Sequence, residues 1–343
     1  MVETVLITGA TGFIALEIAY QLLKQGKYKV KGTVRNLGNK QRNQPLIDLV
    51  PDAKLGPPEL VAADLLSPVG WEEAVKDVDY VLHTASPFYQ SSKEAELVEP
   101  AVQGTLNVLR ACSAEGSKVK RVIVTSSCAS VAYGHKDFSP DHVYTEADWT
   151  NPDNVEAYTK SKTLAEKAAW DFVKTNPGHK FELSTVNPSL VLGRCRTSPG
   201  TSVDLVAQMM TGKIPALPDI NLGVVDVEDV AKAHVRAMEC EVAGERFILS
   251  AAVLNFRDIA DILAEEFRPR GVRVTTARLP RIVGSLLSLF SPQMRSIMRD
   301  WGRRFGIDGS KAERVLGFEY TEPRRSIVAT GNMLIEAGVV RTK

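Results

Sequence analysis

The chain has 343 residues, of which 44% are hydrophobic and 24% are charged. This ordinary globular composition supplies enough material for one large or two modest domains and excludes a generally disordered chain. The 42 basic and 41 acidic residues give a net charge of +1. No overall field therefore draws the chain to nucleic acid or to a membrane surface, and any anion site must be local.

The four cysteines are scattered, with no C-x-x-C spacing, and the N-terminus opens on a strand-like run rather than a signal peptide. We therefore expect free thiols and a cytoplasmic protein. The five histidines show no metal-ligand spacing, so we expect no metal. The longest apolar run, Leu279–Phe290, is too short to span a membrane and contains Arg281. We expect a helix packed in the core or over a pocket, in preference to one on a membrane surface.

Short β-branched runs alternate with helical patterns through the first half of the chain. This alternation is typical of βαβ units on a parallel sheet and predicts a doubly wound α/β (Rossmann) fold. Between the strands, helices are expected near Phe13–Gln25, Val69–Lys76, Ala95–Glu115 and Asn154–Thr175. The expected strands are Thr4–Thr8, Tyr28–Val34, Leu60–Ala62, Tyr80–Thr84, Arg121–Thr125 and Glu182–Val186.

The pattern changes after Asn187, where turn-rich segments appear and strands become sparse. We predict a nucleotide-binding domain over residues 1–190 and a smaller, mainly substrate-binding lobe over residues 191–343. The Asp226–Val235 region is expected to return to the first domain. A lobe over the carboxyl edge of a doubly wound sheet is where a substrate is usually received.

A glycine-rich turn follows the first predicted strand and opens the first helix, in the run Thr8–Ala15. Gly9 permits the tight turn, Gly12 allows close approach of a pyrophosphate, and the helix N-terminus supplies N–H groups. Ala15 stands in the third glycine position, where one methyl group is tolerated. The context predicts a dinucleotide site, and no Gly-Lys-Ser/Thr follows that would indicate a P-loop.

The end of the second predicted strand indicates which dinucleotide is bound. An acid there favours NAD, whereas an arginine favours the 2′-phosphate of NADP. Arg35 stands at that point, Lys40 and Arg42 follow, and no acid occurs between Glu17 and Asp48. NADP(H) is therefore expected in preference to NAD(H). Asp64, after the third strand, could accept from the adenine amino group or cap a turn.

Three hydroxyl and amine groups form the predicted catalytic set. Ser127 ends the fifth strand, and Tyr158 and Lys162 stand four residues apart, hence on one helix face. Ser127 can donate to a carbonyl oxygen that Tyr158 protonates, and Lys162 can lower the tyrosine pKa and reach the nicotinamide ribose. The same spacing recurs at Tyr20/Lys24 and Tyr89/Lys93, but neither pair follows a hydroxyl-bearing strand end.

These motifs together resemble the extended short-chain dehydrogenase/reductase family, over nearly the whole chain. Within the family, the similarity is to the dihydroflavonol 4-reductase, cinnamoyl-CoA reductase and microbial aldehyde reductase branch. The resemblance is carried by Thr8–Ala15, Thr33–Arg35, His83–Pro87, Gly104–Leu109, Thr125–Ser127, Tyr158 with Lys162, Asn187–Val191 and Asp226–Ala231.

The resemblance implies hydride transfer from NADPH to an aldehyde or ketone, with Ser127, Tyr158 and Lys162 as the catalytic triad. A monomer or homodimer that binds a small carbonyl compound is expected. Substrate contacts are expected from Phe88, Cys128 and Leu192. Cofactor contacts are expected from Gly9, Thr11, Gly12, Phe13, Ile14, Arg35, Arg42, Asp64, Leu65, Thr84, Ala85, Ser86, Tyr158, Lys162, Pro188 and Val191.

Two departures from the family pattern are visible. Residues 99–104 lack the proton-relay asparagine of many members, and the turn at Gly193 lacks a following proline, with Arg194 there expected to face solvent. Alternatives that use the same triad are a 3-beta-hydroxysteroid dehydrogenase and a sugar-nucleotide epimerase. A nucleotide-sensing regulatory protein is the alternative of another class, although such proteins tend to lose the tyrosine that is present here.

Overall fold

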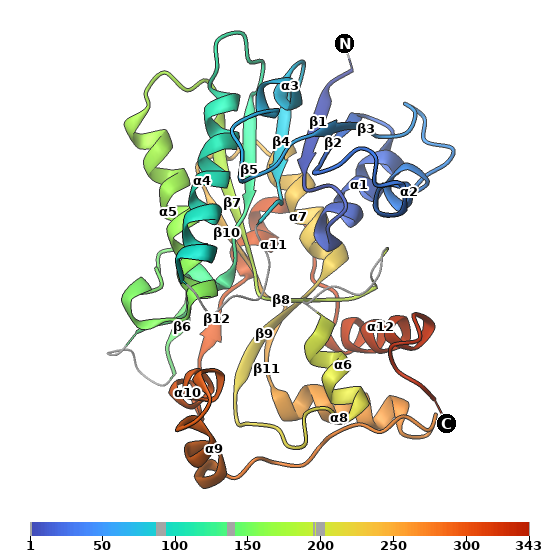
Figure 1. Ribbon diagram of the computed structural model, residues 1–343, viewed down its shortest axis with the longest axis vertical. Coiled ribbons are helices and arrows are strands. Elements are labelled where there is room, and N and C mark those ends of the chain that lie inside the picture. The colour runs from blue at the N-terminus through green and yellow to red at the C-terminus, as the bar shows by residue number, and fades with distance from the viewer. Residues whose placement is uncertain (1, 87–93, 136–140, 195, 197–202, 343) are drawn as a thin grey trace.

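The computed structural model describes residues 2–86, 94–135, 141–194, 196 and 203–342 (Figure 1). A sheet of seven strands, paired in parallel, lies at its centre in the order β10-β7-β5-β4-β1-β2-β3. The strands are β1 (Thr4–Thr8), β2 (Lys29–Val34), β3 (Glu59–Ala62), β4 (Tyr80–His83), β5 (Arg121–Thr125), β7 (Glu182–Pro188) and β10 (Arg246–Leu249). The predicted doubly wound fold is confirmed, and β10 is a strand that the sequence pattern did not predict.

Helices cover both faces of this sheet because its strands are apolar on both sides. In β1, Val5 and Ile7 pack in one core with α1 (Phe13–Gln25), α7 (Val227–Glu239) and α11 (Ser310–Leu316). Leu6 points to the opposite face, into a core with α3 (Trp71–Val75), α4 (Glu94–Cys112) and α5 (Ala157–Thr175). This alternation along one strand fixes the three-layer arrangement.

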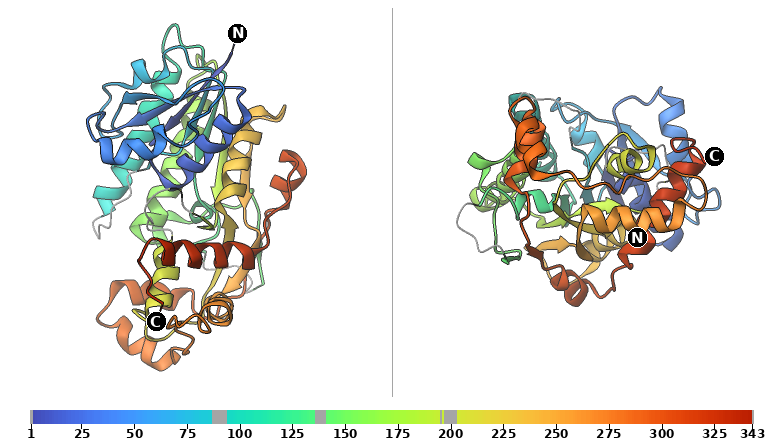
Figure 2. Two further views of the ribbon diagram at one scale, coloured as in Figure 1. Left: turned by 90° about the vertical axis from the view of Figure 1, so that its right-hand side faces the viewer. Right: turned by 90° about the horizontal axis from the view of Figure 1, so that it is seen from below.

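A second lobe lies below the carboxyl edge of the sheet (Figures 1 and 2). Its three-stranded sheet has the order β11-β9-β8, and its core packs α6, α8 and α12 together. The short strands β6 and β12 pair beside it. Its elements are β8 (Leu190–Leu192), α6 (Asp204–Thr211), β9 (Asn221–Asp226), β11 (Ala252–Asn255), α8 (Phe256–Phe267) and α12 (Pro323–Glu336), with β6 (Val143–Tyr144) and β12 (Gly306–Ile307). The boundary at residue 190 stays a prediction.

The apolar run Leu279–Phe290 forms α9 (Arg281–Ser288). The prediction that it packs in the core or over a pocket is wrong, since none of its residues lines the pocket described below. Among the described residues of this helix only Gly284 is buried, whereas Ile282 is 77% exposed and Phe290, just beyond the helix, is 87% exposed. The following helix, α10 (Pro292–Arg299), supplies two residues, Ser296 and Arg299, that line the pocket described below. No helix within the described ranges is long and apolar enough to span a bilayer.

Candidate active site

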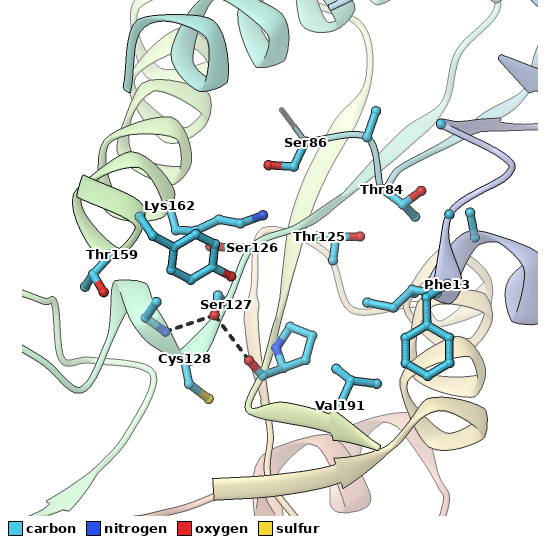
Figure 3. A pocket seen from close by; sticks show the side chains of 18 of the residues that line it. Phe13, Thr84, Ser86, Thr125, Ser126, Ser127, Cys128, Thr159, Lys162 and Val191 are labelled. Carbon is cyan, nitrogen blue, oxygen red and sulfur yellow. Dashed lines mark hydrogen bonds between the residues drawn. The ribbon is translucent and has the colours of Figure 1, made fainter. Parts of the chain in front are cut away.

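A pocket of about 1420 Å³ opens where the carboxyl ends of the strands meet the second lobe. Its walls include the β1–α1 turn, the ends of β2, β4, β5 and β7, the first turns of α5, and the end of α10. Figure 3 shows Ser127 and Lys162 on the wall opposite Phe13 and Thr84. The volume exceeds that of a typical small-molecule site, so it can hold a dinucleotide together with a small substrate.

The glycine-rich turn has the geometry of an anion site. Gly9 has φ of +62°, and a Cβ at that position would lie 3.1 Å from Ala85, so glycine is needed for conformation and for space. Gly12 precedes α1 without any side-chain cap, so the first N–H groups of that helix face the pocket uncapped. Ala15 is buried in the core, as expected for helix-to-strand packing.

Two arginines that follow β2 in the sequence lie on the pocket wall. Arg35 is exposed, and no ion pair to its guanidinium occurs among the described residues. Arg42, in α2 (Lys40–Ile47), donates from Nε to the Thr11 hydroxyl at 3.2 Å, which ties it to the glycine turn. Asn39 caps α2 by accepting from the Arg42 N–H. Exposed guanidinium groups with no acid beside them suit a phosphate group.

Asp64 and Leu65 line the same end of the pocket, beyond β3. The Asp64 carboxylate accepts from the Leu66 N–H at 3.0 Å. It therefore caps a local turn, which is one of the two roles expected for it, the other being a contact with the adenine amino group. Its position on the pocket wall leaves the other carboxylate oxygen available to a ligand. Leu65 packs against Gly104 of α4, where a Cβ would come within 2.9 Å of it.

Thr84, Ala85 and Ser86 continue β4 along the pocket wall, opposite Pro188 and Val191. The Thr84 hydroxyl donates to the Thr8 carbonyl at 2.6 Å, and the Ala85 N–H donates to the Thr8 hydroxyl at 3.0 Å. These bonds hold the end of β4 against the glycine turn. The structure thus places all of the residues predicted to contact the cofactor on one surface.

Ser127 and Tyr158 are brought together at the centre of the pocket. The Ser127 hydroxyl accepts from the Ala129 N–H at 3.1 Å, at the start of a 3₁₀ turn (Cys128–Ser130), and hydrogen-bonds to Tyr158. Burial raises the pKa of Tyr158 above its ordinary value, and the Ser127 hydrogen bond offsets this only in part. The phenol is therefore protonated at neutral pH.

Lys162 lies one turn beyond Tyr158 on α5 and points into the pocket (Figure 3). Burial lowers its pKa to about 8, although the carboxylate of Glu166 raises it. The expected lowering of the tyrosine pKa by Lys162 is not found. Although Tyr158 is 40% exposed, desolvation of its phenol against the pocket wall outweighs the other influences on its pKa. Proximity on a helix face was readable from the sequence, whereas the desolvation of both groups was not.

The pair with the same spacing at Tyr20 and Lys24 lies on α1, away from the pocket lining. The Lys24 amine sits 5.9 Å from the centre of the Tyr20 ring, and Arg196 stacks on the same ring at 3.4 Å. These contacts make Tyr20 a packing residue. The other pair, Tyr89 and Lys93, lies outside the described residues.

Glu166, which the sequence did not single out, is the buried anchor beneath the catalytic candidates. Its carboxylate accepts from Arg246 Nε and from the Asn187 amide, each at 2.7 Å, and from the hydroxyls of Ser126 and Ser130. Burial alone would raise the pKa of Glu166. The opposing effects of Arg246 and the two serines are larger together, so the pKa lies below its ordinary value. The available signal was its position four residues after Lys162.

The three predicted substrate residues have different positions. Cys128 lines the pocket, although its thiol donates to the Asn187 carbonyl at 3.1 Å. Leu192 is fully buried in the core of the second lobe, so its predicted substrate contact is wrong. Neighbouring residues of a strand point to opposite faces, and Val191 takes the pocket side. Phe88 lies outside the described residues.

Residues from the end of α10 close the far side of the pocket and were also missed. They are Ser296, Arg299, Asp300 and Arg303. Arg303 donates to the Asp300 carboxylate at 2.7 Å and to the Tyr144 hydroxyl at 2.9 Å, so its charge is already balanced. Arg194, by contrast, pairs with Glu336 on the surface at 2.7 Å, in line with the expected solvent exposure.

Known proteins match both this sequence and this fold. Residues 5–249 match the NAD dependent epimerase/dehydratase family. The chain is 39% identical to a cinnamoyl-CoA reductase of Medicago truncatula, over 77% of this chain and 80% of that protein. It is 33% identical to an NADPH-dependent methylglyoxal reductase of Saccharomyces cerevisiae, over 97% and 98%. The crystal structure of Candida albicans Gre2 in complex with NADPH superposes with a TM-score of 0.79 at 31% identity, over 98% and 99%.

The chain belongs to the NAD dependent epimerase/dehydratase family, which confirms the predicted membership of the extended short-chain dehydrogenase/reductases. The relatives include the cinnamoyl-CoA reductase branch that the motifs indicated. The assignment of individual site residues rests on the geometry given above and stays a prediction.

Removal of the Glu166 charge is expected to cost stability. Glu166→Gln leaves the buried Arg246 guanidinium without its counter-ion, and breaking such a pair costs about 3–5 kcal/mol. Glu94→Gln is the matched control, because it breaks a more exposed ion pair, with Lys160 on the helix that carries Glu166, and should cost much less stability. Urea unfolding at neutral pH measures both free energies. Equal losses for the two variants would contradict the anchoring role.

Proposed function

We propose that this protein reduces an aldehyde or ketone to an alcohol with NADPH. The observation that carries the proposal is the meeting of Ser127, Tyr158 and Lys162 in the pocket that also holds the glycine turn and Arg35. Among relatives, the yeast protein is named an NADPH-dependent methylglyoxal reductase. The predictions of an NAD(P)-dependent oxidoreductase and of NADP(H) as cofactor are thereby confirmed.

The pocket walls suit each part of the cofactor. The N-terminus of α1 would hold the pyrophosphate, and Arg35 with Arg42 would hold the 2′-phosphate. Asp64 and Leu65 lie where the adenine would be held, and Thr84–Ser86 and Pro188–Val191 would flank the nicotinamide. In this assignment residues 1–190 mainly bind the cofactor, and residues 191–343 mainly enclose the substrate.

The chain's own groups would handle the proton. Bound NADPH supplies a hydride to the carbonyl carbon. Ser127 donates a hydrogen bond to the carbonyl oxygen, and the Tyr158 hydroxyl transfers its proton there as negative charge develops. The raised pKa of Tyr158 keeps that proton in place before reaction. Lys162, as a cation, then stabilises the phenolate and reaches for the ribose hydroxyls.

The substrate side of the pocket favours a small, uncharged carbonyl compound. Tyr133, Leu222 and Ile307 supply aromatic and apolar surface there. The cation of Arg303 is paired with Asp300, and Arg299 on the same wall donates to the Asn154 carbonyl at 3.4 Å. These features support an aromatic or aliphatic aldehyde or ketone in preference to a sugar nucleotide.

Loss of the Tyr158 hydroxyl should abolish most turnover. With NADPH and a panel of aldehydes and ketones, Tyr158→Phe is expected to lower kcat/KM by about a hundredfold to ten-thousandfold, because the general acid is removed. Tyr20→Phe, which alters the non-pocket copy of the motif, should leave turnover unchanged. The measurement is the loss of nicotinamide absorbance. NADPH binding without turnover of any carbonyl compound would favour a sensor instead.

Removal of the Arg35 guanidinium should discriminate between the two dinucleotides. Arg35→Ala is expected to weaken NADPH binding by about tenfold to a hundredfold and NADH binding little, because only NADPH carries the extra phosphate. The surface variant Arg194→Ala serves as control. Dissociation constants from fluorescence titration measure the effect. An equal loss for both cofactors would rule out the phosphate contact.

The charge of Lys162 should set the upper pH limit of NADPH capture. The lowered pKa means that the cation is present below about pH 8 and is lost as the pH rises through that value. The kcat/KM for NADPH, which reports on the free enzyme, should therefore fall above about pH 8. In Lys162→Arg, which stays charged, the fall should move to higher pH. A fall at the same pH in both proteins would assign it to another group.

A further inference from the structure

An apolar patch on the second lobe plays no part in the site described above. Of the 14 large hydrophobic side chains that are exposed within the described ranges, six fall between residues 282 and 290. They range from 41% exposed for Val283 to 87% for Phe290. The six, which we call the α9 patch, are Ile282, Val283, Leu286, Leu287, Leu289 and Phe290. A concentration of this kind marks an interaction surface.

The α9 patch is not a core surface that lacks its packing partner within the lobe. The inner side of α9 is already closed, because a Cβ on Gly284 would come within 2.9 Å of the Trp301 ring and 3.1 Å of the Met298 sulfur. The helix itself lies at the end of the molecule opposite the seven-stranded sheet (Figure 1), and its apolar residues other than Gly284 are exposed there. An extended flat object could therefore reach it without meeting the rest of the protein.

The segment that carries the patch has charged side chains of one sign only, and the last of them, Arg299, also lines the pocket described above. Residues 278–299 contain four arginines and no aspartate or glutamate, in a chain whose overall charge is only +1. All four are exposed, and none forms an ion pair within the described part of the chain. The arginines are Arg278, Arg281, Arg295 and Arg299. Such a surface is complementary to a negatively charged one.

We propose that α9 docks the protein on a membrane surface that contains anionic lipids. A short helix with leucine, isoleucine and phenylalanine outward and arginines beside it is suited to insert its apolar side chains among acyl chains while the guanidinium groups meet lipid phosphates. A second copy of the chain fits less well. A two-fold contact through this patch would bring both sets of arginines together with no acid in the segment to pair them.

The test is sedimentation of the full-length protein with extruded vesicles, either of phosphatidylcholine alone or with phosphatidylserine added. Wild-type protein should sediment with the anionic vesicles and much less with the neutral ones. Leu289→Ser/Phe290→Ser should lower the partition coefficient more than tenfold, because it removes the two C-terminal apolar groups of the patch. Arg278→Gln/Arg281→Gln should lower it about fivefold for each charge removed.

The control is Val242→Ser/Val339→Ser, which removes two other exposed apolar side chains, 43% and 44% exposed and remote in sequence from α9, and should leave vesicle binding unchanged. Thermal unfolding of each variant checks that the fold is kept, since all substituted positions lie on the surface. Failure of the wild-type protein to sediment with either vesicle would overturn the proposal. So would a dimer, seen by analytical ultracentrifugation, that Leu289→Ser/Phe290→Ser dissociates while vesicle binding persists. Neither result bears on the reductase activity, which is measured without lipid.

Discussion

The buried carboxylate of Glu166 joins the parts of the chain on which the site depends. It lies on α5 one turn beyond Lys162 and bonds to the loop after β5, to the end of β7 and, through Arg246, to β10. Those elements are far apart in sequence and adjacent in the sheet. A buried ion needs every one of its lone pairs satisfied, so the carboxylate fixes these elements relative to one another. Ser127 and Pro188 sit on the segments so fixed.

Burial also sets the charge states of the titratable side chains near the pocket. His83 and His234 both lie near it with pKa values of about 3 and about 4, lowered by desolvation, so neither carries charge at neutral pH. His234 contacts the Thr125 hydroxyl at 2.7 Å, and His83 contacts that of Thr8 at 2.8 Å. They serve as neutral hydrogen-bonding supports behind the wall. Neither histidine therefore supplies a cation to the site at neutral pH, and the same kind of burial lowers the pKa of Lys162 to about 8.

Local patterns in the sequence predicted the first half of the fold, and they indicated candidate site residues that mostly line one pocket. The glycine turn, Arg35 at a strand end, and the Tyr158–Lys162 spacing each act within one or two neighbouring elements, so a short stretch of sequence carries the whole signal. Glu166 was missed because its meaning comes from Arg246, 80 residues away. Arg299 and Asp300 reach the pocket from the C-terminal end of α10, and no residue near them in the sequence indicates where that helix packs.

Two of the wrong predictions, for Leu192 and for Leu279–Phe290, have physical reasons of the same kind. Leu192 was assigned with Val191 to the pocket, yet a strand turns adjacent side chains to opposite faces, and only the pairing of β8 with β9 shows which face is which. The Leu279–Phe290 run is apolar, and its composition predicts a helix packed in the core or over a pocket. Hydrophobicity alone does not say whether an apolar helix has a packing partner within the same chain. Here only Gly284 of α9 is buried, where it lies against Trp301 and Met298.

The central claim is that this pocket passes hydride from NADPH to a carbonyl carbon while Tyr158 supplies the proton. The most direct measurement uses NADPH deuterated at nicotinamide C4 with an aldehyde that the protein turns over, followed by mass spectrometry and NMR of the product. The account predicts an alcohol with one deuterium, on the former carbonyl carbon, and none when the label is on the opposite face of the ring. An alcohol without deuterium from either labelled cofactor, or no alcohol from any aldehyde or ketone, would contradict it.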